Sequence, residues 1–193
     1  MDKSNGYEDI AAIFIASRGQ AVGGIGTAAV RKWAKLLPPK ATVLDLGCGP
    51  GIPIAQLLLA EGLRVYGLDA SPAMVAAFRQ NFPMVPVVCE AVEESLFFQR
   101  LFDAVVAWGL LFLLPAQAQE LVIYKAARAL QAGGRLLFTA PAQAGTWRDS
   151  LTGRQSTSLG AEHYRAIVAA ASLSMEEENT DEGQNDYYQA VKH

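Results

Sequence analysis

Three closely spaced glycines and one distant aspartate are the residues whose types and spacing point to chemistry. Gly47, Gly49 and Gly51 follow the short run VLDL, and Asp69 ends a second apolar run 18 residues after the last glycine. Glycines at a strand end let the backbone turn sharply and approach a ligand without Cβ atoms in the way. A carboxylate at the end of the next strand can accept hydrogen bonds from both hydroxyls of a ribose. The arrangement predicts a site for a ligand that contains a nucleoside.

The spacing of the glycines argues against a dinucleotide as that ligand. The dinucleotide fingerprint is G-x-G-x-x-G, whereas residues 47–51 are GCGPG and are preceded by Asp45. A carboxylate at that place would repel a pyrophosphate and would suit a cationic amine. The residues therefore favour a ligand that carries both a ribose and an ammonium group. A dinucleotide-dependent oxidoreductase stays open as a less favoured alternative, and so does a binding module without catalysis.

The elements that must position these groups alternate between strand and helix. Short apolar runs predict five strands, and helical patterns between them predict three helices. Ser71 and Pro72 are typical of a helix start, and Gly133 and Gly134 of a helix end. The alternation predicts a parallel sheet covered by helices on both faces. The expected strands are 41–46, 64–69, 86–90, 102–109 and 135–141, and the expected helices are 52–62, 71–82 and 115–134.

The two ends of the chain have patterns of their own. Near the start, Ile10, Ile13 and Phe14 are expected to share one face of a helix, and a second helix is expected to place Ala29, Trp33 and Leu36 or Leu37 on one face. After Pro141 we expect a loop over 143–157, a helix over 161–173, and two final strands joined by a tight turn at 181–183.

Two pairs of motifs resemble those of class I S-adenosylmethionine-dependent methyltransferases. VLDLGCGPG (43–51) and VYGLDASPAMV (65–75) are similar to motif I and the region after it. FDAVVAWGLLFLL (102–114) and ALQAGGRLLFTAP (129–141) are similar to the fourth and fifth strands of the family. The resemblance covers residues 41–141. It implies a doubly wound, Rossmann-like α/β fold with a seven-stranded sheet, mostly parallel with a C-terminal antiparallel hairpin, and helices on both faces.

The resemblance also implies one domain over residues 1–193 and a set of cofactor-binding residues. Its parts would be a helical cap (1–40), a cofactor-binding core (41–141) and a C-terminal helix and hairpin (142–193). The glycine turn would line the methionine part of S-adenosylmethionine, with S-adenosylhomocysteine as the product. The residues assigned to the cofactor are Asp45 near the amino group, Gly47, Cys48, Gly49 and Gly51 in the turn, Asp69 on the ribose, Ala70 and Met74 beside the adenine, Glu90 and Ala91 where the family usually has Asp-Ala, and Trp108 and Gly109. Glu90 as a solvated loop acid is the alternative.

The acceptor is expected to be a small molecule. The family's amino methyltransferases that act on nucleic acid bases or glutamine often have Asn or Asp followed by Pro-Pro and an aromatic residue after the fourth strand, where this chain has AWGLLFLL. Phe14, Arg18, Phe112, Trp147 and Arg148 are the candidates for acceptor binding, the last two in a loop that would close over the site. The catalytic group stays unassigned. Tyr7 and His163 are weak candidates for it, with helix packing and an exposed helical histidine as their alternatives.

Composition limits the partners further. The chain has 193 residues, 51% of them hydrophobic, and a net charge of −3 from 16 Lys and Arg against 19 Asp and Glu. The basic residues are scattered, which disfavours nucleic acid as a partner, and no apolar run reaches the roughly 18 residues that a membrane helix needs. Cys48 and Cys89 lack metal-ligand spacing, so no metal is expected. We expect a cytoplasmic monomer or homodimer without a membrane anchor.

Overall fold

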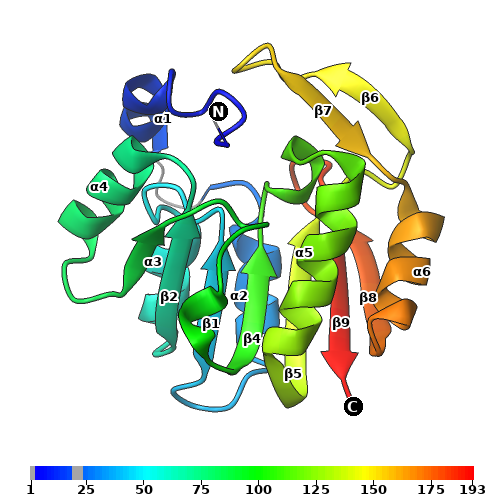
Figure 1. The fold of residues 1–193 in the computed structure, drawn as a ribbon. Coiled ribbons are helices and arrows are strands. Elements are labelled where there is room, and N and C mark those ends of the chain that lie inside the picture. Colours follow the sequence, from blue (N-terminus) through cyan, green and yellow to red (C-terminus); the bar gives the residue numbers. More distant parts are fainter. Residues whose placement is uncertain (1–2, 19–23) are drawn as a thin grey trace.

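A seven-stranded sheet forms the centre of the computed structural model, which describes residues 3–18 and 24–193 (Figure 1). The strand order is β3-β2-β1-β4-β5-β9-β8. The first five strands pair in parallel, and β9 pairs antiparallel with both β5 and β8. This order confirms the predicted doubly wound, mostly parallel fold with a C-terminal antiparallel hairpin. The strands are β1 (Thr42–Leu46), β2 (Arg64–Asp69), β3 (Val87–Cys89), β4 (Phe102–Ala107), β5 (Leu130–Thr139), β8 (Leu173–Thr180) and β9 (Asp186–Lys192).

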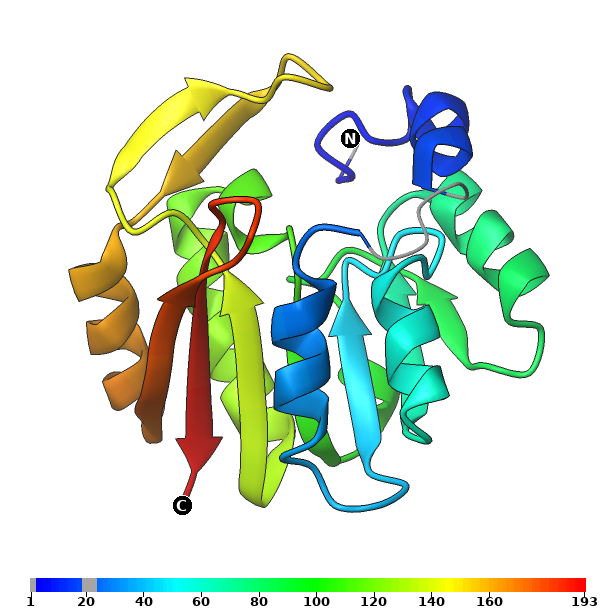
Figure 2. The same ribbon diagram turned by 180° about the vertical axis from the view of Figure 1, so that it is seen from behind.

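Helices cover both faces of the sheet (Figures 1 and 2). On one face, Val43, Val106 and Leu137 pack with Trp33 and Leu58 in one buried apolar cluster. On the other face, alternate residues of the same strands pack with the last two helices in a second cluster. Strands buried on both faces explain the nearly continuous apolar runs of the sequence. The helices are α1 (Ala11–Arg18), α2 (Thr27–Ala34), α3 (Ile54–Ala60), α4 (Pro72–Asn81), α5 (Ala116–Ala129) and α6 (Ala161–Ala170).

The helix predicted over 115–134 is wrong at its C-terminal end. α5 ends at Ala129, and β5 begins at Leu130, so the glycine pair lies inside the strand. Leu130 is 1% exposed and pairs with Phe102 of β4, and this pairing with the sheet overrides the helical pattern. The register between β4 and β5 then shifts before Ala104, in the stretch that contains Gly133 and Gly134. The glycines accommodate an irregular strand and do not end a helix.

Two further expectations near the chain ends are wrong. The segment 143–157 is not a loop, because β6 (Gly145–Arg148) and β7 (Gln155–Ser158) form a separate antiparallel hairpin. Ile13 does not share an apolar face with Phe14, since it is 76% exposed in α1. Leu37 is buried and Leu36 is largely exposed, which settles the choice left open for the second helix.

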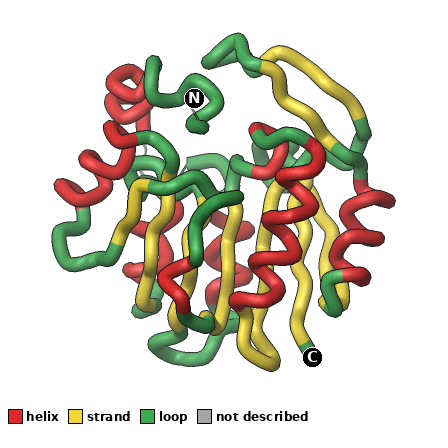
Figure 3. The backbone as a smooth tube through the Cα atoms, viewed as in Figure 1, coloured by secondary structure: helices red, strands yellow, loops and turns green. Residues whose placement is uncertain are grey.

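The carboxyl ends of β1, β2, β4 and β5 meet at one edge of the sheet, where the connecting loops gather (Figure 3). Two elements that are not part of the sheet lie above this edge in both ribbon views, namely the N-terminal segment with α1 and the β6–β7 hairpin (Figures 1 and 2). In open α/β sheets ligands bind outside the carboxyl ends of the strands. The fold therefore places the candidate site between this edge and the two covering elements.

Candidate functional site

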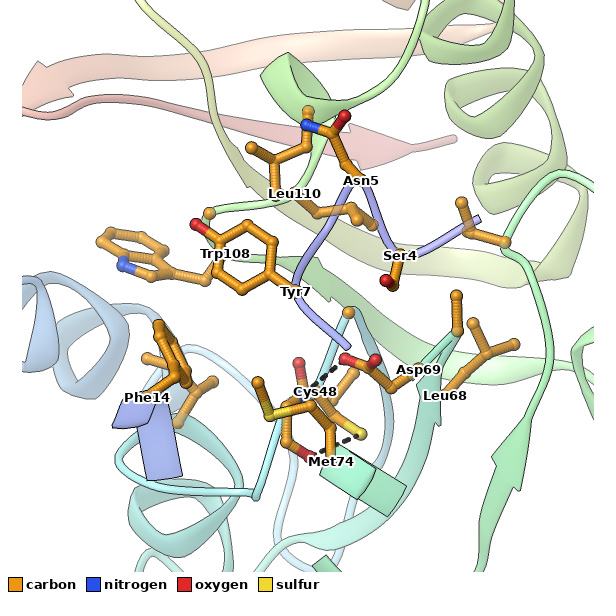
Figure 4. A pocket seen from close by; sticks show the side chains of 18 of the residues that line it. Ser4, Asn5, Tyr7, Phe14, Cys48, Leu68, Asp69, Met74, Trp108 and Leu110 are labelled. Atoms are coloured by element: carbon orange, nitrogen blue, oxygen red, sulfur yellow. Dashed lines mark hydrogen bonds between the residues drawn. The ribbon is translucent and has the colours of Figure 1, made fainter. Parts of the chain in front are cut away.

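A cavity of about 350 Å³ lies at this edge of the sheet. Its volume is typical of small-molecule sites, which run from about 300 to 1,000 Å³. The ends of β1, β2, β4 and β5 contribute to its wall together with residues far away in the sequence. In Figure 4, Tyr7, Phe14 and Trp108 lie on one side of the cavity, and Cys48, Asp69 and Met74 lie on the other.

The glycine turn is tied to the end of β2 by hydrogen bonds. The amide of Gly49 donates to Asp69 Oδ2 and the amide of Ser71 donates to Asp69 Oδ1, both at 2.8 Å. Gly47 and Cys48 also donate their amides to the Leu68 carbonyl. A carboxylate has about four acceptor positions, so two remain for a ligand. Burial raises the pKa of Asp69, and these two N–H donors oppose that rise.

Two glycines of the turn, Gly49 and Gly51, have different surroundings. At Gly49 a Cβ atom would meet only a ring atom of Phe14, at 4.0 Å, so the backbone is bare toward the cavity. At Gly51 a Cβ atom would lie 2.5 Å from Phe82 and 2.9 Å from Phe78. Gly51 does not line the cavity, and this departs from its assignment to the cofactor. Gly51 packs closely against α4, so the absence of a Cβ atom makes room for a helix and not for a ligand.

Asp45 is a buried acid with an unmatched oxygen. It is 2% exposed, it lines the cavity, and its Oδ2 has no hydrogen-bond partner among the residues that the structure describes. Burial raises the pKa of Asp45 to about 8, with a smaller contribution from the neighbouring Asp69 carboxylate. A buried carboxylate without a partner is costly. A ligand with an ammonium group would supply both the missing hydrogen bond and the counter-charge.

The other side of the cavity is fixed by the ends of β4 and β5. Gly109 donates its amide to Thr139 Oγ1 at 2.7 Å, and both residues line the cavity. The Trp108 ring lies 5.9 Å from the Tyr187 ring. A Cβ atom at Gly26 would lie 2.2 Å from the Trp108 ring, so this glycine permits the indole to sit where it does. The arrangement holds Trp108 between the sheet and the segment before α2.

Residues 3–10, here called the N-terminal strap, span the cavity. At one end the Lys3 ammonium lies 3.2 Å from carboxylate oxygens of both Glu93 and Glu94. At the other end Glu8 Oε2 accepts the Ser71 hydroxyl and, at 3.1 Å, the amide of Ala73. Ser71 in turn caps α4 by accepting the Met74 amide at 3.1 Å. The strap is therefore bonded on both sides of the site that it covers.

The tip of the β6–β7 hairpin meets the strap. A Cβ atom at Gly6 would lie 3.1 Å from the side chain of Arg154, and Arg154 approaches Asp9 at 3.8 Å. Leu151, from the same tip, lines the cavity. Two segments that are distant in the sequence thus close the cavity together.

The structure brings most of the predicted site residues to the cavity but leaves several outside. Glu90 and Ala91 line a neighbouring groove, which Ala70 and Lys3 also border. The side chain of Arg18 lies outside the described residues. The predicted residues that line the cavity are Tyr7, Phe14, Asp45, Gly47, Cys48, Gly49, Asp69, Ala70, Met74, Trp108, Gly109 and Phe112.

Trp147, Arg148 and His163 are not among the described residues that line the cavity. Trp147 packs its ring 5.9 Å from that of Phe112, and Arg148 donates to the Gly153 carbonyl within the hairpin. His163 Nε2 lies 2.9 Å from a Glu120 carboxylate on the outer side of α5 and α6. An exposed histidine in such a pair is not placed to act on a ligand in the cavity.

Further residues that line the cavity were not predicted as site residues. Some lie beside predicted ones in the sequence, which was a usable signal, and these are Pro50, Ile52, Pro53, Ile54, Leu68, Val92, Glu93, Leu113 and Leu114. Nothing local indicated the others, which are Lys3, Ser4, Asn5, Ile25, Thr139, Leu151 and Asn185. Within residues 3–18 and 24–193, no group of three or more His, Cys, Asp or Glu side chains could hold a metal ion, and no helix is long and apolar enough to cross a membrane.

Comparison with known proteins identifies the domain. Residues 43–134, from β1 into β5, match the family model described as a methyltransferase domain. A curated tRNA U34 carboxymethyltransferase from Cellvibrio japonicus (strain Ueda107) is 32% identical over 121 residues, which is 55% of this chain and 36% of the relative. The chain thus matches only about a third of that relative's length.

Solved methyltransferase structures share the fold over nearly the whole chain. Magnesium protoporphyrin IX methyltransferase from Synechocystis PCC 6803, with bound S-adenosylhomocysteine, superposes with a TM-score of 0.75 at 18% identity and covers 100% of both chains. A sugar N-methyltransferase from Streptoalloteichus sp ATCC 53650 gives a TM-score of 0.73 at 20% identity over 94% of this chain and 92% of that one. At such identities the likeness concerns the fold. Together with the match over residues 43–134, it supports a methyltransferase domain of the class I, Rossmann-like, S-adenosylmethionine-dependent type.

Proposed function

We propose that this protein transfers a methyl group from S-adenosylmethionine to a small molecule held in the cavity. One observation carries the proposal. The glycine turn, the Asp69 carboxylate and a buried Asp45 oxygen that no described residue hydrogen-bonds line the same cavity as a largely apolar wall. The turn and the two acidic side chains suit a nucleoside with an ammonium group, and the apolar wall suits an organic acceptor.

The chain's residues fit S-adenosylmethionine in charge and shape. Asp69 would accept the ribose hydroxyls through the two acceptor positions that its amide donors leave free. Asp45 would take the ammonium group, and the bare backbone at Gly49 would admit the methionine portion. Ala70 and Met74 would border the adenine beside the groove that Glu90 and Ala91 line. Bound there, the cofactor supplies an electrophilic methyl group on a sulfonium.

Positioning and exclusion of water are what the protein adds to such a reaction. A direct transfer needs the acceptor atom in line with the methyl carbon and the sulfur, and holding two reactants in that geometry is a large part of catalysis. The strap and the hairpin tip cover the cavity, and Leu110, Phe112 and Leu113 give it an apolar wall. The strap must open for the cofactor to enter and its product to leave.

A tRNA acceptor is the second candidate, because the curated relative named above is a tRNA-modifying enzyme. Three carboxylates, Asp45, Asp69 and Glu93, line the cavity, and the chain is net negative, which opposes the approach of a phosphate backbone. We therefore rank the small molecule first. Two free cysteines, one buried and one exposed, suit a reducing compartment, and we place the reaction in the cytoplasm.

Calorimetric titration tests the proposal. S-Adenosylmethionine, S-adenosylhomocysteine and NAD would be titrated into the wild-type chain, the Asp69→Asn variant and the control Asp103→Asn. Asp103 is a matched control because it too accepts a backbone amide, from Thr42 at 2.6 Å, but does not line the cavity. We expect both adenosyl ligands to bind, NAD not to bind, and only Asp69→Asn to weaken binding, by at least about tenfold or 1.4 kcal/mol.

Two results would reject the proposal. One is a chain that binds NAD but neither adenosyl ligand. The other is a chain that binds both adenosyl ligands yet forms no S-adenosylhomocysteine with any small acceptor. In the second case, product formed with tRNA alone would establish the second candidate, and no product at all would leave a binding module.

A further inference from the structure

Glu93 is a carboxylate held on two sides, and no described residue hydrogen-bonds its second oxygen. Its Oε1 lies 3.2 Å from the Lys3 ammonium. Its backbone is fixed from α5, where the Lys125 ammonium donates to the carbonyls of Val92 at 2.8 Å and of Glu93 at 2.9 Å. Its Oε2 is buried and has no hydrogen-bond partner among the described residues, although Glu93 lines the cavity. A ligand group within the cavity would supply a partner for that oxygen.

A second buried polar atom on the cavity wall also has no hydrogen-bond partner among the described residues. Asn5 Nδ2, two residues after Lys3, is buried without a hydrogen-bond partner among the residues described. In Figure 4 the Asn5 side chain lies beside Leu110, away from Asp69 and Cys48. Leaving buried polar atoms unpaired destabilises a protein by about 1–3 kcal/mol each. Neither atom belongs to the set assigned to the cofactor, so both are free for the acceptor.

The charges on the wall restrict what that acceptor can be. Three acidic side chains, Asp45, Asp69 and Glu93, line the cavity, and the cofactor would occupy the first two, so Glu93 is the one left to face the acceptor. Among the described residues of the wall Lys3 is the only cation, and it is already bound by Glu93 and Glu94. An anionic acceptor would meet repulsion without a free cation to bind it. An acceptor with N–H donors would satisfy the Glu93 oxygen and gain from the negative potential.

We infer that the acceptor is a small amine with an apolar body, bound through its N–H group to Glu93 and through an oxygen or another acceptor atom to Asn5. The inference rests on the proposed function and names the substrate class of that same site. The apolar body would lie against Leu110, Phe112 and Leu151, which line the same cavity.

The charge changes during transfer to an amine agree with this placement. An acceptor that binds as an ammonium first gives one proton to water, and its freed lone pair then forms the N–C bond while the C–S bond breaks and the electron pair of that bond moves to sulfur. The positive charge thus passes from sulfur to nitrogen, and the methylated product is again an ammonium. A fixed carboxylate beside the nitrogen stabilises the charge that develops there. Glu93 is in this sense a residue that binds and selects the acceptor.

Binding of matched probes to the S-adenosylhomocysteine-loaded protein tests the inference. Each probe set is one small aromatic ring that carries an aminomethyl, a hydroxymethyl or a carboxylate group, and affinity is measured by ligand-observed NMR titration. We expect the amines to bind at least roughly tenfold more tightly than their matched alcohols and carboxylates. The Glu93→Gln variant should lose that preference, and Glu93→Lys should reverse it in favour of the carboxylates.

Glu94→Gln is the control variant. Glu94 shares the Lys3 ammonium with Glu93, but its side chain is 67% exposed and it does not line the cavity, so the variant should keep the amine preference. Alcohols or carboxylates that bind the wild type as tightly as amines, the absence of any amine binding, or an unchanged preference in Glu93→Gln would overturn the inference. If the wild type did not bind S-adenosylhomocysteine at all, that result would instead reject the proposed function.

Discussion

The two walls of the cavity are built in opposite ways. The cofactor wall comes mainly from one continuous stretch, residues 45–74, in which a strand, a turn and a second strand bring Asp45, Gly49 and Asp69 together by local geometry. The acceptor wall is assembled from residues 3–14, 92–93, 110–114 and 151, which meet only when the strap and the hairpin tip have docked. The cofactor wall therefore depends on the fold of the sheet alone, whereas the acceptor wall also depends on the docking of the strap and the hairpin tip. Substitutions should therefore affect the two walls differently.

The largest effect should come from the glycine that packs on a helix. Gly51→Ala places a Cβ atom 2.5 Å from Phe82 and 2.9 Å from Phe78, at a residue with φ of +81°. Left-handed backbone costs a non-glycine residue about 1–2 kcal/mol, and overpacking adds about 1–3 kcal/mol. We expect the free energy of unfolding to fall by about 3 kcal/mol in total, as measured by urea denaturation. An unchanged midpoint would mean that the turn does not pack on α4 as described.

Substitution of Gly49 should weaken cofactor binding and should destabilise the fold only slightly. Gly49→Ala at φ of +53° meets no atom nearer than 4.0 Å, so unfolding should become easier by only about 1 kcal/mol. The added methyl group occupies the space into which the cofactor would fit, so affinity for S-adenosylhomocysteine should fall at least roughly tenfold in calorimetry. Full affinity in this variant would contradict the placement of the ligand along the turn.

Asp45 should make cofactor binding release a proton. In the free protein burial raises the pKa of Asp45 to about 8, so the carboxyl is mostly protonated at pH 7. Pairing with an ammonium group requires the ionised form, so affinity should rise as the pH rises from 6 toward 8. Calorimetry at pH 7 in buffers of different ionisation enthalpy should show nearly one proton released by the wild type and none by Asp45→Asn. Equal proton release by both would contradict the pairing.

The same pKa shift has a consequence for stability without ligand. The folded-state pKa of Asp45 lies above the unfolded value, so the folded protein binds more protons between about pH 4 and pH 8. Stability should therefore decrease as the pH rises through this window, and Asp45→Asn should remove that part of the slope. Denaturation curves collected across the window measure it.

The strap should control how fast the cofactor leaves. Glu8→Gln weakens the hydrogen bonds to the Ser71 hydroxyl and the Ala73 amide. Hydrogen bonds to charged groups are worth about 1.5–3 kcal/mol. Glutamine keeps part of this hydrogen-bond energy. Release of S-adenosylhomocysteine in stopped-flow experiments should therefore become roughly three- to tenfold faster. Asp9→Asn is the control, since this acid is 73% exposed and its long ion pair with Arg154, at 3.8 Å, should contribute little to closure.

The smallest effect should be at His163. The residue is exposed and paired with Glu120 on the outer surface, so His163→Ala should leave cofactor affinity unchanged and alter stability by no more than about 0.5 kcal/mol. A large loss of methyl transfer in this variant would show that the hairpin and α6 move toward the cavity during the reaction.

The same contrast explains what the sequence could predict. The strands β1, β2 and β4, the Ser71 cap and the positions of Asp45 and Asp69 followed from short-range patterns, because each depends on neighbours within a turn or a strand. The β6–β7 hairpin, the strap and Glu93 were missed, because tertiary contacts decide them. Gly51 belongs to the expected motif but faces Phe78 and Phe82 and not the cavity. The spacing of glycines does not show which atoms lie next to each of them.

A crystal structure of the chain with S-adenosylhomocysteine would show directly where the cofactor binds. We predict the ribose hydroxyls on the Asp69 carboxylate, the amino group beside Asp45 Oδ2 and the homocysteine chain along Gly49, with the space toward Glu93 and Asn5 left for the acceptor. A ligand whose ribose lies away from Asp69, or whose amino group leaves Asp45 unpaired, would contradict it.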